Sequence, residues 1–370
     1  MLLDWRDAHM ISNPLVKKLK QNLNSHKSIL KSLTANELKI VKEIEKRTTI
    51  ANKNNISRTS AYLEFYLDHQ EIDWAFLAHM VSRNAGWNMT DLKGTYLPFL
   101  LNEEEQEYFF LFLERCNWLI FQDAYPQLLL YAYCKKENKD YFHLLSHFGV
   151  SVFMEHNWRL YYTYKDASLL TVALIINEQH YIEERVIQNA HYKATIMESI
   201  DLKVQDWFQL NFILFPTPSR DLFGQSIQQF QLLKERIAIG KSLYSLLFHK
   251  DYFSQFLTYA KNTSHTGSRK DYWPDLFHEV NNPPSNHQFY PIIEGCSLVD
   301  LTKKIYSPVL VHAWKDIDHT PSKRGDWYKN TNILAYYRKQ KKVQPSPVSD
   351  SYCQALNKME LAILTKQKFK

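Results

Sequence analysis

The chain has 370 residues, 45% hydrophobic, 14% aromatic and 23% charged, which excludes a disordered protein because enough apolar surface can be buried to offset chain entropy. Its formal net charge of +6 is unevenly spread: residues 1–60 hold 12 Lys/Arg against 5 Asp/Glu, residues 61–130 hold 3 against 11, and residues 300–370 hold 14 against 6. Such basic ends predict contact with the acidic segment, or with an anionic partner such as nucleic acid or a lipid surface.

Neither a secretory signal nor a transmembrane segment is predicted. Asp4, Arg6 and Asp7 interrupt the N-terminal apolar stretch. The longest apolar runs, such as residues 169–176, are far shorter than the ~20 residues that span a bilayer. The cysteines lie far apart without a C-x-x-C motif, so we expect free thiols in a cytoplasmic protein; they are Cys116, Cys134, Cys296 and Cys353.

Helix signals dominate from the N-terminus onward. Asn13-Pro14 predicts a helix start, and Thr34 with Glu37 forms a capping-box pattern before a second amphipathic helix. Residues 71–85 predict a buried helix that is apolar around most of its circumference and that Gly86 ends. Asn102 and Glu105 predict the start of another helix. Further helices are expected at 126–138, 140–148, 166–188, 203–214, 225–248 and 250–262.

Turn residues and charges mix after Asn262, which predicts a boundary there. We expect one or two helices within 292–314, a flexible linker at 339–351 and a short tail helix at 354–364. The predicted fold is all-α, a multi-helix domain with a smaller, less regular C-terminal part. Its regions are a basic N-terminal helical region (1–60), a helical core (61–262), an aromatic and His-rich part (263–340), and the linker with the tail helix (341–370).

The spacing of the glycines excludes the common nucleotide-binding loops. The chain has eight glycines, and the nearest two, Gly86 and Gly94, are eight positions apart. A Walker loop or a dinucleotide fingerprint needs closely spaced glycines so that bare backbone can approach phosphate oxygens. The G-x-S-x-G elbow, the kinase glycine loop and H-E-x-x-H are also absent.

The first candidate site lies in the segment 79–91. His79 and Arg83 share one face of an apolar helix, which predicts an anion-binding arginine beside an acid/base histidine. Asp91 is expected to pair with Arg83, unless an acidic residue elsewhere does so. Asn84 and Asn88 would complete a binding pocket. The alternative is a buried polar network that fixes helix packing, which is the commoner outcome for such residues.

The second candidate site lies in the segment 312–326. Asp316, Asp318 and His319 could ligate a divalent cation. Lys323 and Arg324 would then hold a phosphate. The alternative is a solvated loop with ordinary charge pairs, because D-x-D alone is a weak motif.

A basic and aromatic stretch near the C-terminus could neutralise phosphates and stack bases, or could be a solvated tail. It contains Lys329, Tyr336, Tyr337, Arg338, Lys339, Lys341 and Lys342. If nucleic acid binds, we expect Lys17, Lys18 and Lys20 to form one basic surface with residues 339–342.

Residues 57–94, SRTSAYLEFYLDHQEIDWAFLAHMVSRNAGWNMTDLKG, resemble the YppC-like family of uncharacterised proteins from bacilli. The resemblance extends to HAWKDIDHTPSKRGDWY at residues 312–328 and implies a bacterial cytosolic setting, with no activity or catalytic residue attached. Because common catalytic and nucleotide-binding motifs are absent while charge is segregated along the chain, we expect a non-enzymatic protein that binds a macromolecular partner, whether anionic or not. The alternative is an enzyme for a phosphorylated or anionic small molecule, with or without a metal; no cofactor can be named.

Overall fold

The computed structural model describes residues 13–26, 32–192, 212–227, 229, 231–281, 288–322, 325–338 and 344–369. The chain is predominantly α-helical, which confirms the predicted fold class, and its described residues form three two-stranded sheets. Within the same residues, none of the helices has the length and apolar character needed to cross a bilayer.

The elements follow one another along the chain with short connections. The α-helices are α1 (Asn13–Ser25), α2 (Ala35–Ala51), α3 (Asn55–Asp68), α4 (Asp73–Asp91), α5 (Leu97–Leu100), α6 (Glu103–Glu137), α7 (Val152–Tyr164), α8 (Ala167–Ile182), α9 (Ala190–Tyr192), α11 (Leu233–Leu247), α12 (Phe253–Asn262), α13 (Leu310–Ala313) and α14 (Ser349–Lys368). The 3-10 helices are η2 (Phe142–Phe148), η5 (Arg269–Asp271) and η6 (Thr331–Tyr337), and η3 (Glu183–Ile187) is a π-helix.

The strands are short and pair locally or across the C-terminal part. They are β1 (Phe212–Pro216), β2 (Leu222–Ser226), β3 (Phe277–His278), β4 (Ile293–Glu294), β5 (Ser297–Leu298) and β6 (Ile305–Tyr306). The pairs β1–β2 and β4–β5 are antiparallel, with Leu214 opposite Gly224 in the first pair, whereas β3 and β6 are parallel.

Side-chain caps start the two helices for which the sequence predicts them. The Thr34 side chain accepts a hydrogen bond from the Glu37 amide, and the Glu37 carboxylate accepts one from the Thr34 amide. Asn102 and Glu105 make the same reciprocal pair before α6. Each box satisfies backbone donors that would otherwise lack partners at a helix start.

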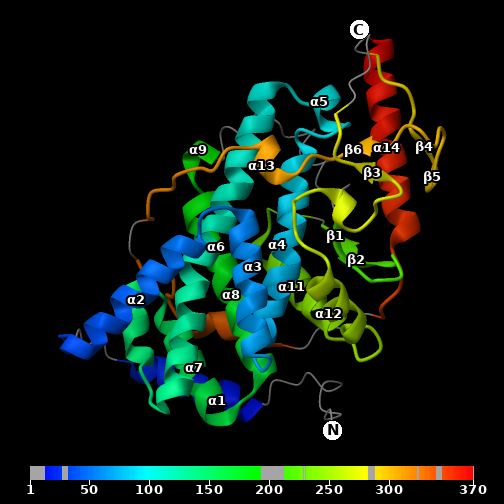
Figure 1. The fold of residues 1–370 in the computed structure, drawn as a ribbon. Helices are drawn as coiled ribbons and strands as arrows, with labels where there is room; N and C mark the ends of the chain where they lie inside the picture. Colours follow the sequence, from blue (N-terminus) through cyan, green and yellow to red (C-terminus); the bar gives the residue numbers. More distant parts are fainter. Residues whose placement is uncertain are drawn as a thin grey trace.

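Helix α8 lies at the centre of the helical part, where it packs against α4, α6, α7 and α11. All its residues from Leu169 to Asn177 are buried, as expected for a helix that is apolar on every side. Helices α3 and α4 form a tightly packed hairpin, and α6 runs along α2, α3 and α4 (Figure 1). These contacts place α4, which carries the first candidate site, in the interior.

The C-terminal part lies in two places: η6 packs against α1 and α8, while α14 and the short strands lie on another flank (Figure 1). Figure 1 shows α14 at the right edge, beside β3, β4, β5 and β6. A disulfide joins Cys296, beside β5, to Cys353 in α14, while Cys116 and Cys134 are buried free thiols. The prediction that all four cysteines are free is therefore wrong, because the fold brings together two residues 57 positions apart.

Two helix boundaries differ from the predictions because tertiary contacts override local signals. Helix α4 continues through Gly86 to Asp91. A Cβ at Gly86 would stand 2.4 Å from Asn55 Oδ1 and 2.5 Å from His265 Nε2, so this position has no room for a side chain. The glycine permits close packing and does not end the helix. Helix α6 likewise continues through Pro126, where a new helix was expected.

Other segments differ in type. Residues 212–216 form β1 and not the end of a helix, and residues 203–211 of that predicted helix lie outside the described residues. Within 292–314, β4, β5 and β6 replace most of the expected helix, and only α13 is helical. Helices α3 and α7 were not predicted. The tail helix is confirmed and is longer than expected.

One hydrophobic cluster connects both sides of the boundary expected at Asn262. It includes Leu174 in α8 and Leu247 in α11 together with Leu310, Trp327 and Tyr352 from the C-terminal part. The predicted regions 1–60, 61–262, 263–340 and 341–370 remain predictions.

Candidate functional site

His79 and Arg83 lie in the interior and bond to each other. Their exposed fractions are 2% and 1%. The Arg83 Nε donates to His79 Nε2 at 3.1 Å, and His79 Nδ1 donates to the Thr59 carbonyl at 2.8 Å. Burial and the charge of Arg83 hold the pKa of His79 well below its ordinary value, so the ring is neutral. Its one lone pair is occupied by Arg83, which leaves no free base at this position.

The remaining partners of Arg83 are neutral oxygens, and this corrects the prediction of a pair with Asp91. The guanidinium donates to the Thr263 carbonyl and to the Tyr259 hydroxyl, the latter at 3.4 Å. Burial lowers the pKa of Arg83, an effect that the nearby Asp271 opposes. The Tyr259 hydroxyl donates to the Asp271 carbonyl at 3.3 Å, and the Asp271 carboxylate accepts hydrogen bonds from Thr266, so Arg83 belongs to a connected buried network.

Asp91 instead pairs with Arg269 of η5. Arg269 Nε and Nη2 approach the carboxylate at 2.8 and 2.6 Å, a two-pronged geometry that suits guanidinium and carboxylate. Arg269 Nη2 also donates to Asn88 Oδ1 at 3.2 Å. The Asn84 amide exchanges hydrogen bonds with both backbone groups of Leu214 in β1, at 2.9 and 2.7 Å. These side chains fix the C-terminal part and β1 onto α4.

The second candidate segment does not form the predicted metal site. Asp316 accepts a hydrogen bond from Asn54 Nδ2 at 2.8 Å and forms an ion pair with Lys53 at 3.1 Å. His319 Nε2 lies 3.6 Å from Glu114 Oε1, and Asp318 is exposed. No group of three His, Cys, Asp or Glu side chains among the described residues could hold a metal ion. Lys323 and Arg324 lie outside the described residues.

The two candidate segments touch without sharing bonding partners. His79 and Arg83 bond to residues 59, 259 and 263, whereas Asp316 and His319 face residues 53, 54 and 114. The link between them is Trp314, whose indole donates to the Met89 carbonyl at 2.8 Å. The buried polar network, weighed above as the alternative for 79–91, is therefore the arrangement observed.

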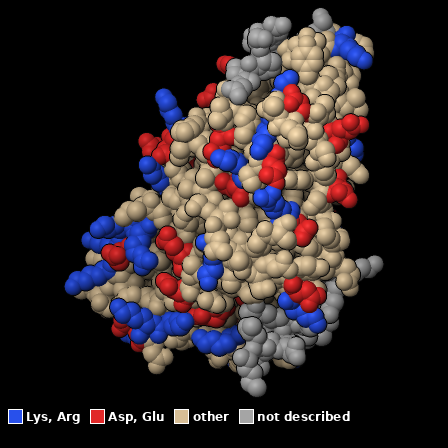
Figure 2. Space-filling view, turned by 45° about the vertical axis from the view of Figure 1, so that its right-hand side comes forward, with Lys and Arg blue, Asp and Glu red and all other residues tan. Residues whose placement is uncertain are grey.

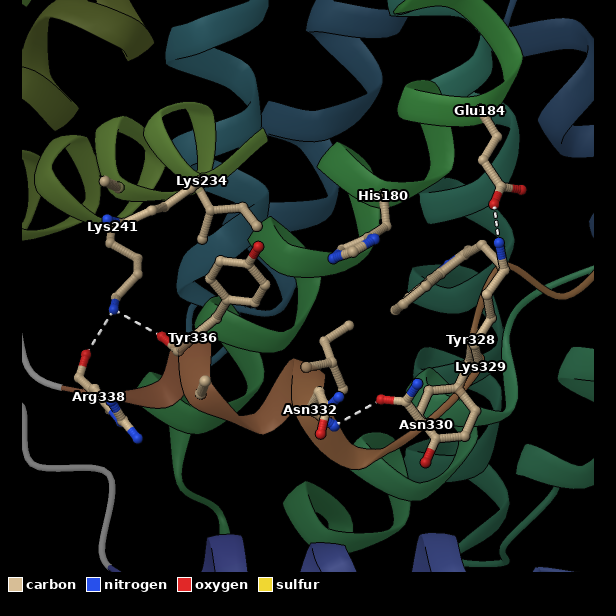
Figure 3. Close-up of a pocket in the computed structure, with 15 residues that line it drawn as sticks. His180, Glu184, Lys234, Lys241, Tyr328, Lys329, Asn330, Asn332, Tyr336 and Arg338 are labelled. Carbon is tan, nitrogen blue, oxygen red and sulfur yellow. Dashed lines mark hydrogen bonds and ion pairs between the residues drawn. The ribbon is translucent and has the colours of Figure 1, made fainter. Parts of the chain in front are cut away.

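A cleft of about 700 Å³ opens elsewhere, between α8 with η3, helix α11 and the segment 327–338 (Figure 3). We call it the cleft. Its charged lining is four cations against one carboxylate: Lys234, Lys241, Lys329 and Arg338 against Glu184. Its aromatic lining is His180, Trp327, Tyr328 and Tyr336.

Internal contacts shape the cleft walls. The Lys241 ammonium donates to the Tyr336 and Arg338 carbonyls, each at 2.8 Å, which ties η6 to α11. Lys329 pairs with Glu184 at 2.7 Å across the other wall (Figure 3). Lys234 and Arg338 are exposed and have no carboxylate partner within the described part of the chain. These two cations are available to an anionic ligand.

The aromatic wall is rigid and uncharged near neutral pH. The His180 ring stacks on Trp327 with centroids 4.6 Å apart and planes 16° apart. Burial lowers the pKa of His180 to about 4, so its ring is neutral. Trp327 is anchored by its indole nitrogen, which donates to Asn177 Oδ1 at 2.9 Å. Tyr336 also lines the cleft and packs edge-on against His180, with ring centroids 5.9 Å apart (Figure 3).

Helix α1 packs against η6, so the basic N-terminal helix borders the segment that lines the cleft. Lys17 and Lys20 are exposed there, and Lys18 donates to the Tyr164 hydroxyl at 2.5 Å. Figure 2 shows Lys and Arg gathered at the lower left of one face, with acidic groups among them. Residues 339–342 lie outside the described residues, so their predicted union with α1 remains a prediction.

Sequence reasoning found only one wall of the cleft. The stretch with Lys329, Tyr336 and Arg338 was singled out by its basic and aromatic composition. Lys234, Lys241 and His180 carry no local signal, because they join that stretch only through the packing of α8 and α11.

Comparison with known proteins supports the resemblance seen at residues 57–94. A family model described as "Protein of unknown function (DUF2515)" matches residues 50–353. The chain is 38% identical over 315 residues to the uncharacterized protein YppC of Bacillus subtilis (strain 168), and this alignment covers 85% of the chain and 91% of that protein. No solved structure matches the chain.

Proposed function

The chain belongs to the DUF2515 family of proteins of unknown function, and from this premise we propose that it is a non-enzymatic protein that binds single-stranded nucleic acid in the cleft. The observation that carries the proposal is the lining of the cleft, where Lys234 and Arg338, which have no carboxylate partner among the described residues, stand beside aromatic rings. Lysine and arginine neutralise phosphates, and aromatic faces stack on bases of any sequence.

The positions of the side chains suit one or two nucleotides. Lys234 and Arg338 are exposed and would contact phosphates. Tyr328 and Tyr336 are half-buried, so each can offer a ring face to a base while its backbone stays fixed. The exposed Lys17 and Lys20 of the neighbouring α1 would extend the path of a longer strand.

A concave site favours a strand over a lipid surface. A flat anionic membrane is contacted by cations that protrude from a protein surface. The rings of the cleft instead line a hollow of about 700 Å³, which a strand can enter. The enzyme alternative has less support, because His79 and Arg83 are sealed in the interior and bonded to each other. A cytoplasmic bacterial setting is part of the proposal, and there the Cys296–Cys353 pair would be reduced.

Fluorescence anisotropy with labelled 15-nucleotide poly(dT) and poly(U) tests the proposal on the full chain. We expect binding, and the logarithm of the binding constant should fall linearly with the logarithm of the salt concentration, with a slope of about −0.7 for each phosphate contacted. The double variant Lys234→Ala/Arg338→Ala should bind roughly tenfold more weakly, and its affinity should depend less steeply on salt. Tyr336→Ala should weaken binding about tenfold without changing the slope, because stacking releases no counterions.

Lys303→Ala is the matched control, because Lys303 is exposed and, within the described part of the chain, its ion pair is with Asp300 three positions away. It should leave affinity unchanged. Competition with a free mononucleotide distinguishes a small-molecule site from a strand site, and vesicles with anionic headgroups test the lipid surface. Equal affinity of the wild type and the cleft variants, or binding to vesicles alone, would contradict the proposal.

A further inference from the structure

A second hollow lies in the helical interior, apart from the cleft. It has a volume of about 190 Å³, is partly open, and is lined by residues of α3, α4, α6, α8, α11 and β1 and by residue 227. We call it the cavity. Its lining is mostly aliphatic and aromatic, with one carboxyl group, that of Glu178, and two arginines, Arg58 and Arg236.

Helices α4 and α6 each line the cavity with partly accessible residues that lie on one face of the helix. Helix α4 is buried almost throughout, and its partly accessible residues include Ala78, Val81 and Ala85, which share one face and line the cavity. On α6, the partly accessible Leu113, Asn117 and Ile120 line it in the same way. Small side chains on α4 therefore leave a space that the neighbouring helices do not fill.

Both arginines at the cavity are neutralised by other carboxylates. Arg58 Nη2 pairs with Glu114 Oε2 at 2.5 Å, and Arg236 pairs with Glu183. Glu178 has no ion pair with a lysine or arginine within the described part of the chain. Its Oε1 accepts a hydrogen bond from Gln179 at 3.1 Å. Burial raises the pKa of Glu178 to about 7, although hydrogen bonds from Gln179 and Trp74 act in the opposite direction.

Tyr62 brings a buried hydroxyl group to the same wall. Its side chain is 3% exposed, lines the cavity and packs edge-on against Trp74 with ring centroids 5.6 Å apart. The hydroxyl has no hydrogen-bond partner among the described residues. Leaving a buried hydroxyl unpaired costs stability, and such a group in a native fold points to a missing partner.

We propose that the cavity binds a small, largely apolar molecule that carries one protonated amine, with the ammonium group paired to Glu178. The size fits, because an engineered protein cavity of about 150 Å³ holds a benzene molecule. A hollow of about 190 Å³ therefore accommodates one ring with a short side chain. The ammonium would supply the positive charge that Glu178 lacks, and the Tyr62 hydroxyl stands at the same wall.

Isothermal titration of the full chain with three probes of similar size tests the charge and the site. The probes are benzylamine, toluene and sodium benzoate. We expect benzylamine to bind at least about tenfold more tightly than toluene, since a hydrogen bond between charged groups is added. Benzoate should not bind, because its carboxylate would face Glu178.

Glu178→Gln keeps the shape of the wall and should remove the preference for benzylamine over toluene. Ala85→Leu fills the space and should abolish binding of both, with circular dichroism showing that each variant is folded. Glu184→Gln is the matched control, since Glu184 lines the cleft and not the cavity. The proposal is overturned if benzylamine does not bind, if toluene binds as tightly, or if benzylamine affinity survives both substitutions.

Discussion

Asp123 is a buried carboxyl group in the middle of α6, 2% exposed. Its Oδ2 accepts hydrogen bonds from Gln127 Nε2 at 2.8 Å and from Asn177 Nδ2 at 2.5 Å, while Oδ1 has no partner among the described residues. Burial raises its pKa to about 7, although the hydrogen bond from Asn177 acts in the opposite direction. The folded chain therefore holds a proton on Asp123 over a pH range in which the unfolded chain releases it.

We predict that Asp123→Asn makes the protein less sensitive to rising pH. Because the folded pKa is raised, the stability associated with Asp123 is complete below about pH 4 and is lost as pH rises to about 7. The loss is at most about 1.4 kcal/mol for each pH unit. The melting temperature of the variant should gain on the wild type between pH 4.5 and 7 and then keep a constant offset. A difference independent of pH would contradict this assignment.

Arg83 and Glu114 show how charged side chains are accommodated in the interior of this fold. Glu114 pairs with Arg58, and although burial raises its pKa, Arg58 and His319 lower it below the ordinary value. Among the described residues, the partners of Arg83 are two neutral oxygens and the neutral His79. Charged side chains of this kind are retained where a hydrogen-bond network holds several elements in register.

At the scale of elements, α14 is held to the molecule near its start and at its middle. Cys353 is bonded to Cys296, and the Tyr352 hydroxyl accepts from Tyr272 at 2.9 Å. Further along, the Glu360 carboxylate accepts from the Tyr96 hydroxyl at 2.9 Å and from the Ile292 amide at 3.0 Å. The disulfide is thus one of several anchors.

We predict that Cys296→Ser destabilises the protein without releasing α14. A cross-link between residues 57 positions apart restricts the unfolded chain, which corresponds to at most about 4 kcal/mol. Urea unfolding should show the loss, and dithiothreitol should reproduce it in the wild type while leaving the variant unchanged. If thiol titration of the folded wild type finds Cys296 free, the cross-link does not form and this prediction fails.

At the scale of the whole molecule, the C-terminal part completes the core of the helical part. The Tyr337 hydroxyl donates to Asn157 Oδ1 at 2.6 Å, and Trp327 bonds to Asn177 of α8. Both aromatic rings are buried. Without this part, apolar surface and polar groups of α7 and α8 would face water.

We therefore predict that residues 1–262 do not fold on their own. The fragment should show weak near-ultraviolet circular dichroism and no cooperative melting, whereas the full chain should unfold in one transition because it has one continuous core. Adding a separate 263–370 fragment should restore part of the signal. A fragment 1–262 that melts cooperatively near the temperature of the full chain would instead support the boundary predicted at Asn262.

Patterns that act within a few residues were predictable from the sequence. The capping boxes at Thr34 and Asn102 and the burial of α4 are confirmed, since hydrogen bonds across one turn and the spacing of apolar residues determine them. The helical class and the family resemblance follow from the same kind of signal.

Contacts between distant residues were decided by the tertiary structure alone. Gly86 lies inside α4, where the close approach of Asn55 and His265 leaves no room for a side chain. Cys296 is bonded to Cys353, which is 57 positions away in the sequence. Arg83 donates hydrogen bonds to Tyr259 and Thr263, whereas Asp91 accepts them from Arg269. The spacing of residues along the sequence does not reveal these partners. The cleft joins α8, α11 and η6 for the same reason: a binding surface depends on which helices pack together, and that is set by the whole core.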